Sequence, residues 1–399
     1  MTNADCWLLP EGIEDILPNE TATLEFLRRD VLQLFHSWGY QRVIPPMVEF
    51  LDSLLTGSAY DLELETFKVI DQLSGRLMGV RADMTPQVAR IDARLNLNKS
   101  QASRYCYLGT TLRTRGSHLE RSRSPLQIGA ELYGFAGYHA DVEVIRLMLE
   151  MLAMSGLLHV QLELGHVGIY QSLVKLAGLN SQQEITLFDI LQRKAHVELA
   201  EFVNDCYVDA AMQSMLLALP DLCGDRSVLS RARTVLKQAD DSVYQALDGL
   251  ENIESALAVH FPLLDVHFDL TELRGYHYKT GVVFSAFVPG FGREVARGGR
   301  YDSIGNGFGE SRPATGFSAD LKILARLGGP LRDQPEDKSI IAPSLDDPEL
   351  HNLVRDLRAS GHVVIEAMPD QQIEDNPMGC AEQLVQENGW WHVKSIRNE

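Results

Sequence analysis

Residues Gln101 to Gly134 read QASRYCYLGTTLRTRGSHLERSRSPLQIGAELYG, with two apolar, β-favouring runs on either side of a polar loop. The runs Tyr105–Leu112 and Leu126–Tyr133 predict the two strands of a long hairpin. The loop between them carries four arginines in a chain that is otherwise acidic: Arg113, Arg115, Arg121 and Arg123. Because guanidinium groups bind carboxylates and phosphates, the stretch predicts a hairpin whose loop binds an anion.

The second strand of this hairpin alternates between a polar and an apolar face. The polar face holds Gln127, Gly129 and Glu131, and the apolar face holds Leu126, Ile128, Ala130 and Leu132. Such a strand fits the floor of a polar small-molecule site. A solvated hairpin with a basic tip fits the same residues, because arginine and glutamate are exposed by default.

The composition of the chain excludes several kinds of function. The chain has 399 residues, enough for two or three domains, and a formal net charge of −19 that opposes broad binding to nucleic acid. Its five cysteines are scattered and form no C-x-x-C pair, which predicts no disulfide framework, no metal site and a reducing cytoplasm. No apolar run approaches the roughly 20 residues that span a bilayer, and the N-terminal residues do not resemble a signal peptide. No membrane association and no cofactor is expected.

The N-terminal part predicts a shaped loop at Leu9–Pro18 and a helix whose apolar face runs from Leu24 to Trp38. A strand at Tyr40–Ile44 and a hairpin of Phe67–Ile70 with Leu77–Val80 follow. Next, Asp83 and Thr85 precede Pro86, which suits the first turn of a helix bearing Val88, Ile91 and Leu95. An Asp and a Thr in this position are usually just helix caps.

Further along, a helix is predicted at Asp141–Ser155 and strands at Val160–Leu164 and Val266–Leu270, with a helical insertion between these strands at about residues 170–262. Tyr276 and Tyr278 lie two residues apart, so on a strand they would share a face. Residues Ala314–Leu327 fit a strand that runs into a buried helix. The C-terminal residues predict strand, helix, strand, helix and strand at Lys338–Ala342, Pro348–Ser360, His362–Ala367, Met378–Glu387 and Trp390–Ser395.

Several of these segments, in this order, resemble the class II aminoacyl-tRNA synthetases in their histidyl form. The hairpin is similar to motif 2, the first helix and strand to motif 1, and Ala314–Leu327 to motif 3. Arg274-Gly275 resembles the RG of the histidyl-specific motif, and residues 298–302 read GGRYD as in that family. The resemblance implies an α+β fold, with an antiparallel sheet flanked by helices, and a dimer interface at motif 1.

The resemblance also implies a histidine site made of Asp83, Thr85, Arg113, Gln127, Glu131, Arg274, Tyr276 and Tyr278. The amine would meet Asp83, Thr85 and Gln127. The carboxylate would meet Arg113 and Arg274. The imidazole would meet Glu131 and Tyr278, with Tyr276 as a second aromatic wall.

The chain departs from active synthetases where they bind ATP. Ile323 stands at the motif 3 position of the arginine that binds the ATP phosphates, and isoleucine cannot hydrogen-bond a phosphate. Arg115 stands where motif 2 carries an acid that accepts from adenine, and arginine has no acceptor atom. Lys322 replaces a further acidic residue. These residues predict a chain that binds histidine without activating it.

The C-terminal segment, about residues 336–399, is shorter than a synthetase anticodon-binding domain and rich in acidic residues, so no tRNA partner is expected. With a synthetase-like core at 1–330, the whole chain resembles the regulatory subunits of short-form ATP phosphoribosyltransferase. That resemblance implies a non-catalytic chain that binds L-histidine for feedback inhibition in histidine biosynthesis. It also implies a hetero-octamer with the short catalytic subunit, which needs the regulatory chain for full activity. An active histidyl-tRNA synthetase, or another synthetase paralogue, is the alternative.

Overall fold

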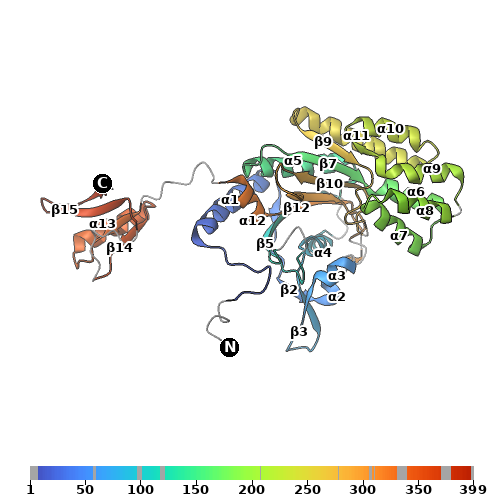
Figure 1. The fold of residues 1–399 in the computed structure, drawn as a ribbon. Coiled ribbons are helices and arrows are strands. Elements are labelled where there is room, and N and C mark those ends of the chain that lie inside the picture. The colour runs from blue at the N-terminus through green and yellow to red at the C-terminus, as the bar shows by residue number, and fades with distance from the viewer. Residues whose placement is uncertain are drawn as a thin grey trace. The chain divides into compact units, whose positions relative to one another are not determined.

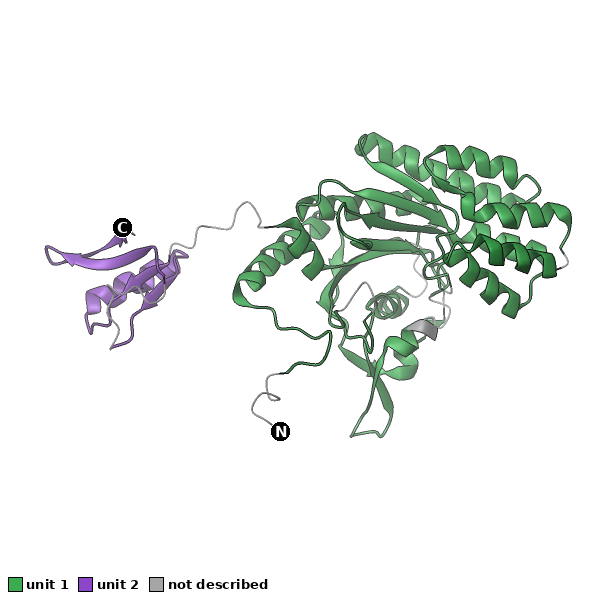
Figure 2. Ribbon diagram, in the orientation of Figure 1, with its two compact units in different colours: residues 1–329 green, residues 330–399 purple. Residues whose placement is uncertain are grey.

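The structure is a computed structural model that describes residues 8–56, 60–96, 101–116, 122–206, 208–276, 278–304, 308–309, 311–329, 339–369 and 379–396. The chain divides into two compact units, Met1–Gly329 and Pro330–Glu399, which are coloured separately in Figure 2. Arg121 of the hairpin loop lies outside the described residues.

A nine-stranded sheet forms the centre of the described part of the first unit (Figure 1), with the order β1-β5-β6-β12-β11-β10-β7-β9-β8. Its strands are β1 (Gln41–Arg42), β5 (Ser103–Thr110), β6 (Leu126–Tyr133), β7 (Gln161–His166), β8 (Cys223–Gly224), β9 (Asp265–Asp269), β10 (Val282–Phe287), β11 (Ala296–Arg300) and β12 (Ala314–Asp320). Two pairs, β1 with β5 and β7 with β9, are parallel, so the predicted antiparallel sheet is in fact mixed. Parallel neighbours need a long crossover, which the helical segment supplies between β7 and β9.

The predicted hairpin is the β5–β6 pair, in which Ser103 lies opposite Tyr133 and Thr110 opposite Leu126. A separate three-stranded sheet has the order β2-β4-β3, with β2 at Val48–Phe50, β3 at Phe67–Ile70 and β4 at Leu77–Val80. The β3–β4 hairpin has the bounds that its apolar runs predict.

The helices that flank the large sheet are α1 (Pro18–Ser37), α4 (Thr85–Leu95), α5 (Tyr138–Met154) and α12 (Leu321–Gly328), with two short helices α2 (Leu51–Leu54) and α3 (Tyr60–Glu65). On α1 the buried residues Leu24, Leu27, Val31 and Phe35 recur at helical spacing, so one apolar stripe faces the core. Gly39, with φ of 82°, ends this helical region as predicted, since a left-handed residue stops a helix and glycine adopts it freely.

The segment between β7 and β9 is helical. Its elements are α6 (Val167–Ala177), α7 (Ser181–Gln192), α8 (His196–Asp205), α9 (Ala210–Ala218), the short η2 (Leu219–Asp221), α10 (Ser227–Val235) and α11 (Asp241–His260). Asn180 and Gln183 form a capping box that starts α7, and Asp209 and Asp240 cap α9 and α11. Among the described helices of the whole chain, none is both long enough and apolar enough to cross a bilayer.

In its described residues, the second unit is a four-stranded sheet of order β14-β13-β15-β16 with one helix. The elements are β13 (Ile340–Ala342), α13 (Pro348–Ala359), β14 (Val364–Glu366), β15 (Glu382–Glu387) and β16 (Trp390–Ser395). The predicted helix at Met378–Glu387 is wrong, because its described part is a strand that pairs with β16. Asn388 and Gly389, with φ of 56° and 86°, form a two-residue turn between them, and such a turn matches the twist of paired strands.

Candidate functional site

Two connected pockets open beside β6, β11 and β12. The inner pocket, of about 380 Å³ including open space at its mouth, is lined by residues that include Thr85, Glu131, Tyr278, Lys279 and Tyr301. The outer pocket, of about 540 Å³ including open space at its mouth, is lined by residues that include Arg113, Gln127, Arg293, Glu294 and Ile323. Asp83, Arg297 and Ser318 line both, so the two pockets form one cavity.

Glu131 is the carboxylate at the inner end of the cavity and is only 1% exposed. Three hydroxyl groups surround it: Tyr107 donates to Oε1 at 2.9 Å, Thr85 donates to the same oxygen at 3.1 Å, and Tyr301 donates to Oε2. Burial raises the pKa of Glu131 to about 8, and the nearby carboxylate of Asp83 adds to the rise, while the three hydroxyls oppose it. This end of the cavity therefore holds a hydrogen-bonding carboxyl group that is already fixed in place. Its pKa lies near neutral pH.

Gly316 makes room for that carboxylate. It lies opposite Glu131 in the β6–β12 pairing, and a methyl group at Gly316 would overlap Glu131 Oε2. Glu131 therefore lies directly over the β12 backbone, and only glycine at position 316 leaves this space open.

Asp83 and Gln127 form the next part of the cavity wall. The Gln127 amide donates to Asp83 Oδ1 at 2.7 Å and accepts from the backbone N–H of Met84 at 2.9 Å. Asp83 Oδ1 also accepts from the backbone N–H of Thr85 at 3.0 Å. These bonds join the segment before α4 to β6, so two segments that are far apart in the sequence line one surface.

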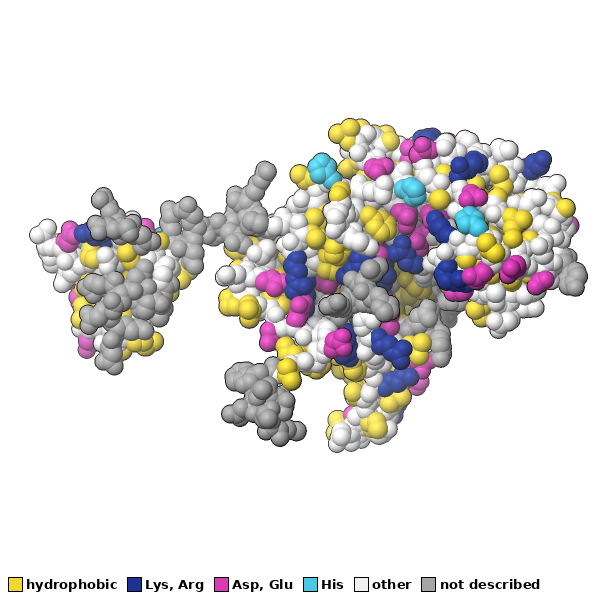
Figure 3. Space-filling view, viewed as in Figure 1, with side chains coloured by type: hydrophobic (Ala, Val, Ile, Leu, Met, Phe, Trp, Pro, Cys, Tyr) yellow, Lys and Arg dark blue, Asp and Glu magenta, His cyan; other side chains and the backbone are white. Residues whose placement is uncertain are grey.

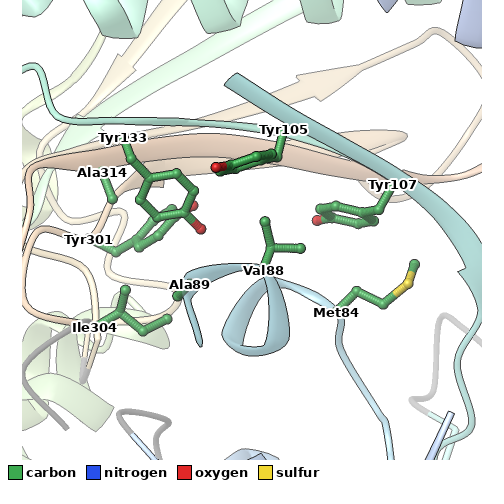
Figure 4. Packing of buried hydrophobic residues seen from close by; sticks show 9 residues of the cluster. All are labelled: Met84, Val88, Ala89, Tyr105, Tyr107, Tyr133, Tyr301, Ile304 and Ala314. Carbon is green, nitrogen blue, oxygen red and sulfur yellow. The ribbon is translucent and has the colours of Figure 1, made fainter. Parts of the chain in front are cut away.

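A cluster of packed tyrosine side chains supports this surface. Figure 4 shows Val88 of α4 pointing toward the tyrosine rings of β5, with Tyr133 and Tyr301 beside each other. The ring centroids of Tyr133 and Tyr301 lie 6.4 Å apart, nearly at right angles. The tyrosine hydroxyls that bind Glu131 are thus held in place by packed rings. A ligand that binds here would restrict little further motion of these side chains.

The outer pocket is richer in full charges. Arg113 pairs with Glu65 at 3.6 Å, and Arg297 pairs with Glu294 at 3.4 Å. Arg115 is exposed, and Ile323 on the first turn of α12 supplies an apolar side chain to the wall. On the face shown in Figure 3, acidic and basic side chains gather together near the middle of the larger unit.

Arg274 lies among three carboxylates. Its guanidinium pairs with Glu272 at 2.9 Å, Glu294 at 2.8 Å and Glu163 at 3.5 Å. Burial and the carboxylates of Glu272 and Asp269 raise the pKa of Glu163 to about 7, so acidic groups crowd this region. The sequence predicted a partner for a ligand carboxylate here, and the structure shows that any such ligand must compete with these ion pairs.

The prediction that Tyr276 and Tyr278 share one face is wrong. The described backbone around Gly275 forms turns, with Tyr276 N–H bonded to Leu273 O and Tyr278 N–H bonded to Gly275 O. Residues two apart share a face in an extended strand, and this segment is not extended. Tyr276 packs against Tyr170 and Phe188 and donates to Glu184 of the helical segment, whereas Tyr278 lines the inner pocket.

The sequence prediction does not include Tyr107, Arg297 and Tyr301, which line or support the cavity. Lys279 also lines the inner pocket, at a position where the resemblance implies a tyrosine. Tyr301 lies in the GGRYD segment, in which the sequence prediction rests on the two glycines. In that segment Arg300 has a structural role, since it pairs with the buried Asp141 at 3.0 Å. Within the described residues, no group of three His, Cys, Asp or Glu side chains is placed to hold a metal ion.

Comparison with known proteins agrees with this geometry. A family model described as Histidyl-tRNA synthetase matches residues 12–324, and one described as ATP phosphoribosyltransferase subunit HisZ C-terminal domain matches residues 337–394. The ATP phosphoribosyltransferase regulatory subunit of Methylococcus capsulatus is 52% identical over 397 residues, covering 99% of this chain and 97% of the relative. That of Pseudomonas fluorescens is 51% identical, covering 99% and 100%.

Solved structures agree as well. A structure described as an ATP phosphoribosyltransferase regulatory subunit/histidyl-tRNA synthetase from Bacillus halodurans has a TM-score of 0.83 at 26% identity, covering 94% of this chain and 97% of that one. Histidyl-tRNA synthetase from Nostoc shares the fold, with a TM-score of 0.71 at 16% identity over 98% of this chain and 94% of that one. These matches confirm the resemblance in the sequence, and the chain belongs to the family of ATP phosphoribosyltransferase regulatory subunits, which have a histidyl-tRNA synthetase-like core.

Proposed function

We propose that this chain is the non-catalytic regulatory subunit of ATP phosphoribosyltransferase in the first step of histidine biosynthesis, and that its cavity binds L-histidine for feedback inhibition. One observation carries the proposal: the inner end of the cavity keeps a complete hydrogen-bond network around Glu131, while Ile323 stands in the wall of the outer end. A site that only binds an amino acid needs the hydrogen-bond network around Glu131. It needs no cation for ATP phosphates at position 323.

The inner network suits the polar atoms of histidine. Asp83 and Gln127 present acceptors for an ammonium group, and Glu131 presents a buried acceptor for an imidazole N–H beside the ring of Tyr278. Arg113 and Arg297 line the outer pocket, next to the place where the α-carboxylate would lie. Arg274 would join them only after exchanging one of its three carboxylate partners.

Ile323 supports a role without amino-acid activation. Phosphoryl-transfer sites place cations on the phosphate oxygens, and losing one such group typically lowers the rate by about 10²-fold or more. The cationic side chains near Ile323 on α12 already have partners within the chain. Lys322 donates to Ser124 O at 2.8 Å, and Arg326 pairs with Glu14 at 3.0 Å. The relatives are named regulatory subunits, in agreement with a non-catalytic role.

The partner in this proposal is the short-form catalytic subunit, in a cytoplasmic hetero-octamer built on dimers of the regulatory chain. Exposed apolar side chains around the β2-β4-β3 sheet and the motif 1 strand suit the dimer contact: Ile44, Met47, Val69, Ile70 and Leu73. No tRNA enters the proposal, because the short C-terminal unit is acidic. If the inhibited arrangement of the assembly binds histidine more tightly, histidine populates it, with a coupling free energy of about 1–3 kcal/mol.

Two measurements on the purified chain test the proposal. Titration calorimetry with L-histidine should show binding, and histidine-dependent ATP–pyrophosphate exchange on the same sample should stay at background. Exchange above background would instead support an active histidyl-tRNA synthetase.

The assembled complex tests the regulatory part. Glu131→Ala should abolish inhibition by histidine while the assembly still forms, because the buried acceptor for the ring is lost. Glu198→Ala, an exposed glutamate that pairs with Arg193 on the helical segment, is the matched control and should leave inhibition unchanged. Undiminished inhibition in the Glu131 variant would rule out this cavity as the feedback site.

A further inference from the structure

Lys279 is a buried cation in the wall of the inner pocket. It is 7% exposed, and its ammonium donates to the carbonyl oxygen of Gly298 at 2.7 Å. Among the described residues this is the one acceptor that its Nζ contacts, whereas an ammonium carries three N–H groups. A buried donor that is left without an acceptor is costly, so the remaining N–H groups call for a ligand acceptor.

The stem of Lys279 is held in place. A Cβ at Gly299, whose φ is 155°, would lie 3.2 Å from both Cδ and Cε of Lys279, so the lysine stem crosses directly over this glycine on β11. The next residue of β11 along the pocket wall, Gly298, supplies the carbonyl acceptor. The position of Nζ at the pocket wall is therefore set by the backbone of one strand.

Several charged groups face this ammonium. Arg297 lies on β11 and Glu294 just before it, and Glu272 and Arg274 belong to the loop that carries Lys279. Asp83, in the loop before α4, and Glu131 of β6 line the same pocket. Burial lowers the pKa of Lys279 to about 7, and Arg297 adds to this effect.

Glu131 can accept a further hydrogen bond, which complements the donors of Lys279. In its ionised form the carboxylate of Glu131 offers about four acceptor positions, and the hydroxyls of Thr85, Tyr107 and Tyr301 occupy three. One acceptor position thus remains at Glu131, and donor positions remain at Lys279, in the wall of the same pocket. A neutral imidazole needs such a pair, because one ring nitrogen donates and the other accepts.

We propose that Lys279 donates to the unprotonated ring nitrogen of the bound histidine while Glu131 accepts from the protonated one, so that the pocket selects the neutral imidazole. This inference rests on the proposed histidine-binding function and adds the ionisation state that the site recognises. An imidazolium carries two N–H groups and no acceptor, so it would place a donor and a positive charge against Lys279. The cationic form of the ligand is excluded for that reason.

A comparison of two ligands tests the inference on the wild-type chain. L-histidine and 1,2,4-triazole-3-alanine have similar shapes, but the triazole ring stays neutral across the useful pH range. Titrations of Glu131, Lys279 and the other protein groups affect both ligands, so the ratio of their Kd values isolates the ring. Below the imidazole pKa of about 6.5, the ratio of histidine Kd to triazolylalanine Kd should rise about tenfold for each unit of pH. A ratio that stays constant from about pH 5.5 to about pH 8 would overturn the inference.

Lys279→Met tests the residue itself. Loss of the hydrogen bond from Lys279 to the ring should weaken histidine binding by about tenfold at high pH, and the ratio of the two Kd values should lose its pH dependence. Lys322→Met is the matched control, since Lys322 is also buried and bonded to a carbonyl oxygen but lines neither pocket. If Lys279 instead meets the ligand carboxylate, its variant will weaken both ligands equally and keep the wild-type ratio profile, which contradicts the inference.

The two hypotheses fail separately. Wild-type chain that binds no histidine at any pH would overturn the proposed function. Histidine binding with a constant ratio would leave that function standing and remove only the role of Lys279. The ligand comparison needs no variant, so it also decides the case in which Lys279→Met does not fold.

Discussion

The inner and outer ends of the cavity differ in how their polar groups are satisfied. At the inner end, Glu131 receives three hydroxyl donors from packed aromatic and threonine side chains, and it is almost fully buried. At the outer end, Arg113 and Arg297 form partly exposed ion pairs, and Ile323 lies in the wall. Buried hydrogen-bond networks tolerate little change, whereas exposed ion pairs contribute only about 0–1 kcal/mol each. In the proposed function, the inner end binds the amino acid and the outer end needs no contact with a phosphate.

Gly316→Ala should have the largest effect on the inner end. The new methyl group would overlap Glu131 Oε2, so the carboxylate or β12 must move. We expect histidine binding to fall by about 100-fold or more and the chain to lose about 1–3 kcal/mol of stability. Titration calorimetry and thermal unfolding measure the two effects.

Gly249→Ala on α11 is the matched control. A Cβ there meets no atom within 4 Å, so alanine should stabilise the helix by about 0.5–1 kcal/mol and leave histidine binding unchanged. Equal histidine affinity in the Gly316 and Gly249 variants would show that the crowding at Glu131 has no part in binding.

Tyr301→Phe should have the next largest effect. The change removes one hydroxyl donor from Glu131 and keeps the ring, so histidine Kd should rise about tenfold. Tyr276→Phe is its counterpart: that hydroxyl bonds Glu184 in the helical segment, and we expect less than about a twofold change in Kd. If Tyr276→Phe instead raised the histidine Kd more than Tyr301→Phe, Tyr276 would belong to the ligand site and Tyr301 would not.

The pH dependence of stability should show a smaller difference between wild type and Glu131→Gln. The pKa of Glu131 is raised to about 8 in the folded chain, above about 4.3 in the unfolded chain. Its stabilising contribution is therefore complete below about pH 4.3 and is lost as the pH rises toward 8. Wild type should lose stability relative to Glu131→Gln between about pH 5 and about pH 7, as measured by urea unfolding. A difference that does not change with pH would mean that Glu131 titrates normally.

Ile323→Arg should have the smallest effect. It restores a cation on α12 at the outer end, but Arg115 still lacks an acceptor for adenine. We expect histidine affinity to stay within about twofold of wild type and ATP–pyrophosphate exchange to remain at background. The appearance of exchange would mean that the outer end is one residue away from catalysis, and the contrast between the two ends would weaken.

Much of the inner end was predictable because alternation along a strand determines which side chains share a face. Gln127 and Glu131 do lie on the same side of β6 and line one cavity, and β12 runs into α12 as the motif predicts. The sequence of the hairpin in the second unit also carries its own turn signal, since Asn388-Gly389 is a dipeptide typical of two-residue hairpin loops. That signal favours two strands over the predicted helix at Met378–Glu387.

Other features depend on which strands become neighbours. Tyr107 lies opposite Gly129 in the β5–β6 register, and the absence of a side chain there lets its ring lean across β6 to reach Glu131. Tyr301 reaches the same carboxylate from a segment 170 residues further on. Local patterns contain no information about such pairings, because each one depends on how the sheet assembles.

The sequence alone determined the class of fold, the polar face of β6 and the apolar side chain of Ile323, because periodicity and residue chemistry are local properties. Only the tertiary structure decided that Arg274 lies among three carboxylates, that Tyr276 turns toward the helices, and that Lys279 lies buried beside the pocket. These outcomes follow from turns and long-range packing, in which the position of a charge depends on groups that are distant in the chain.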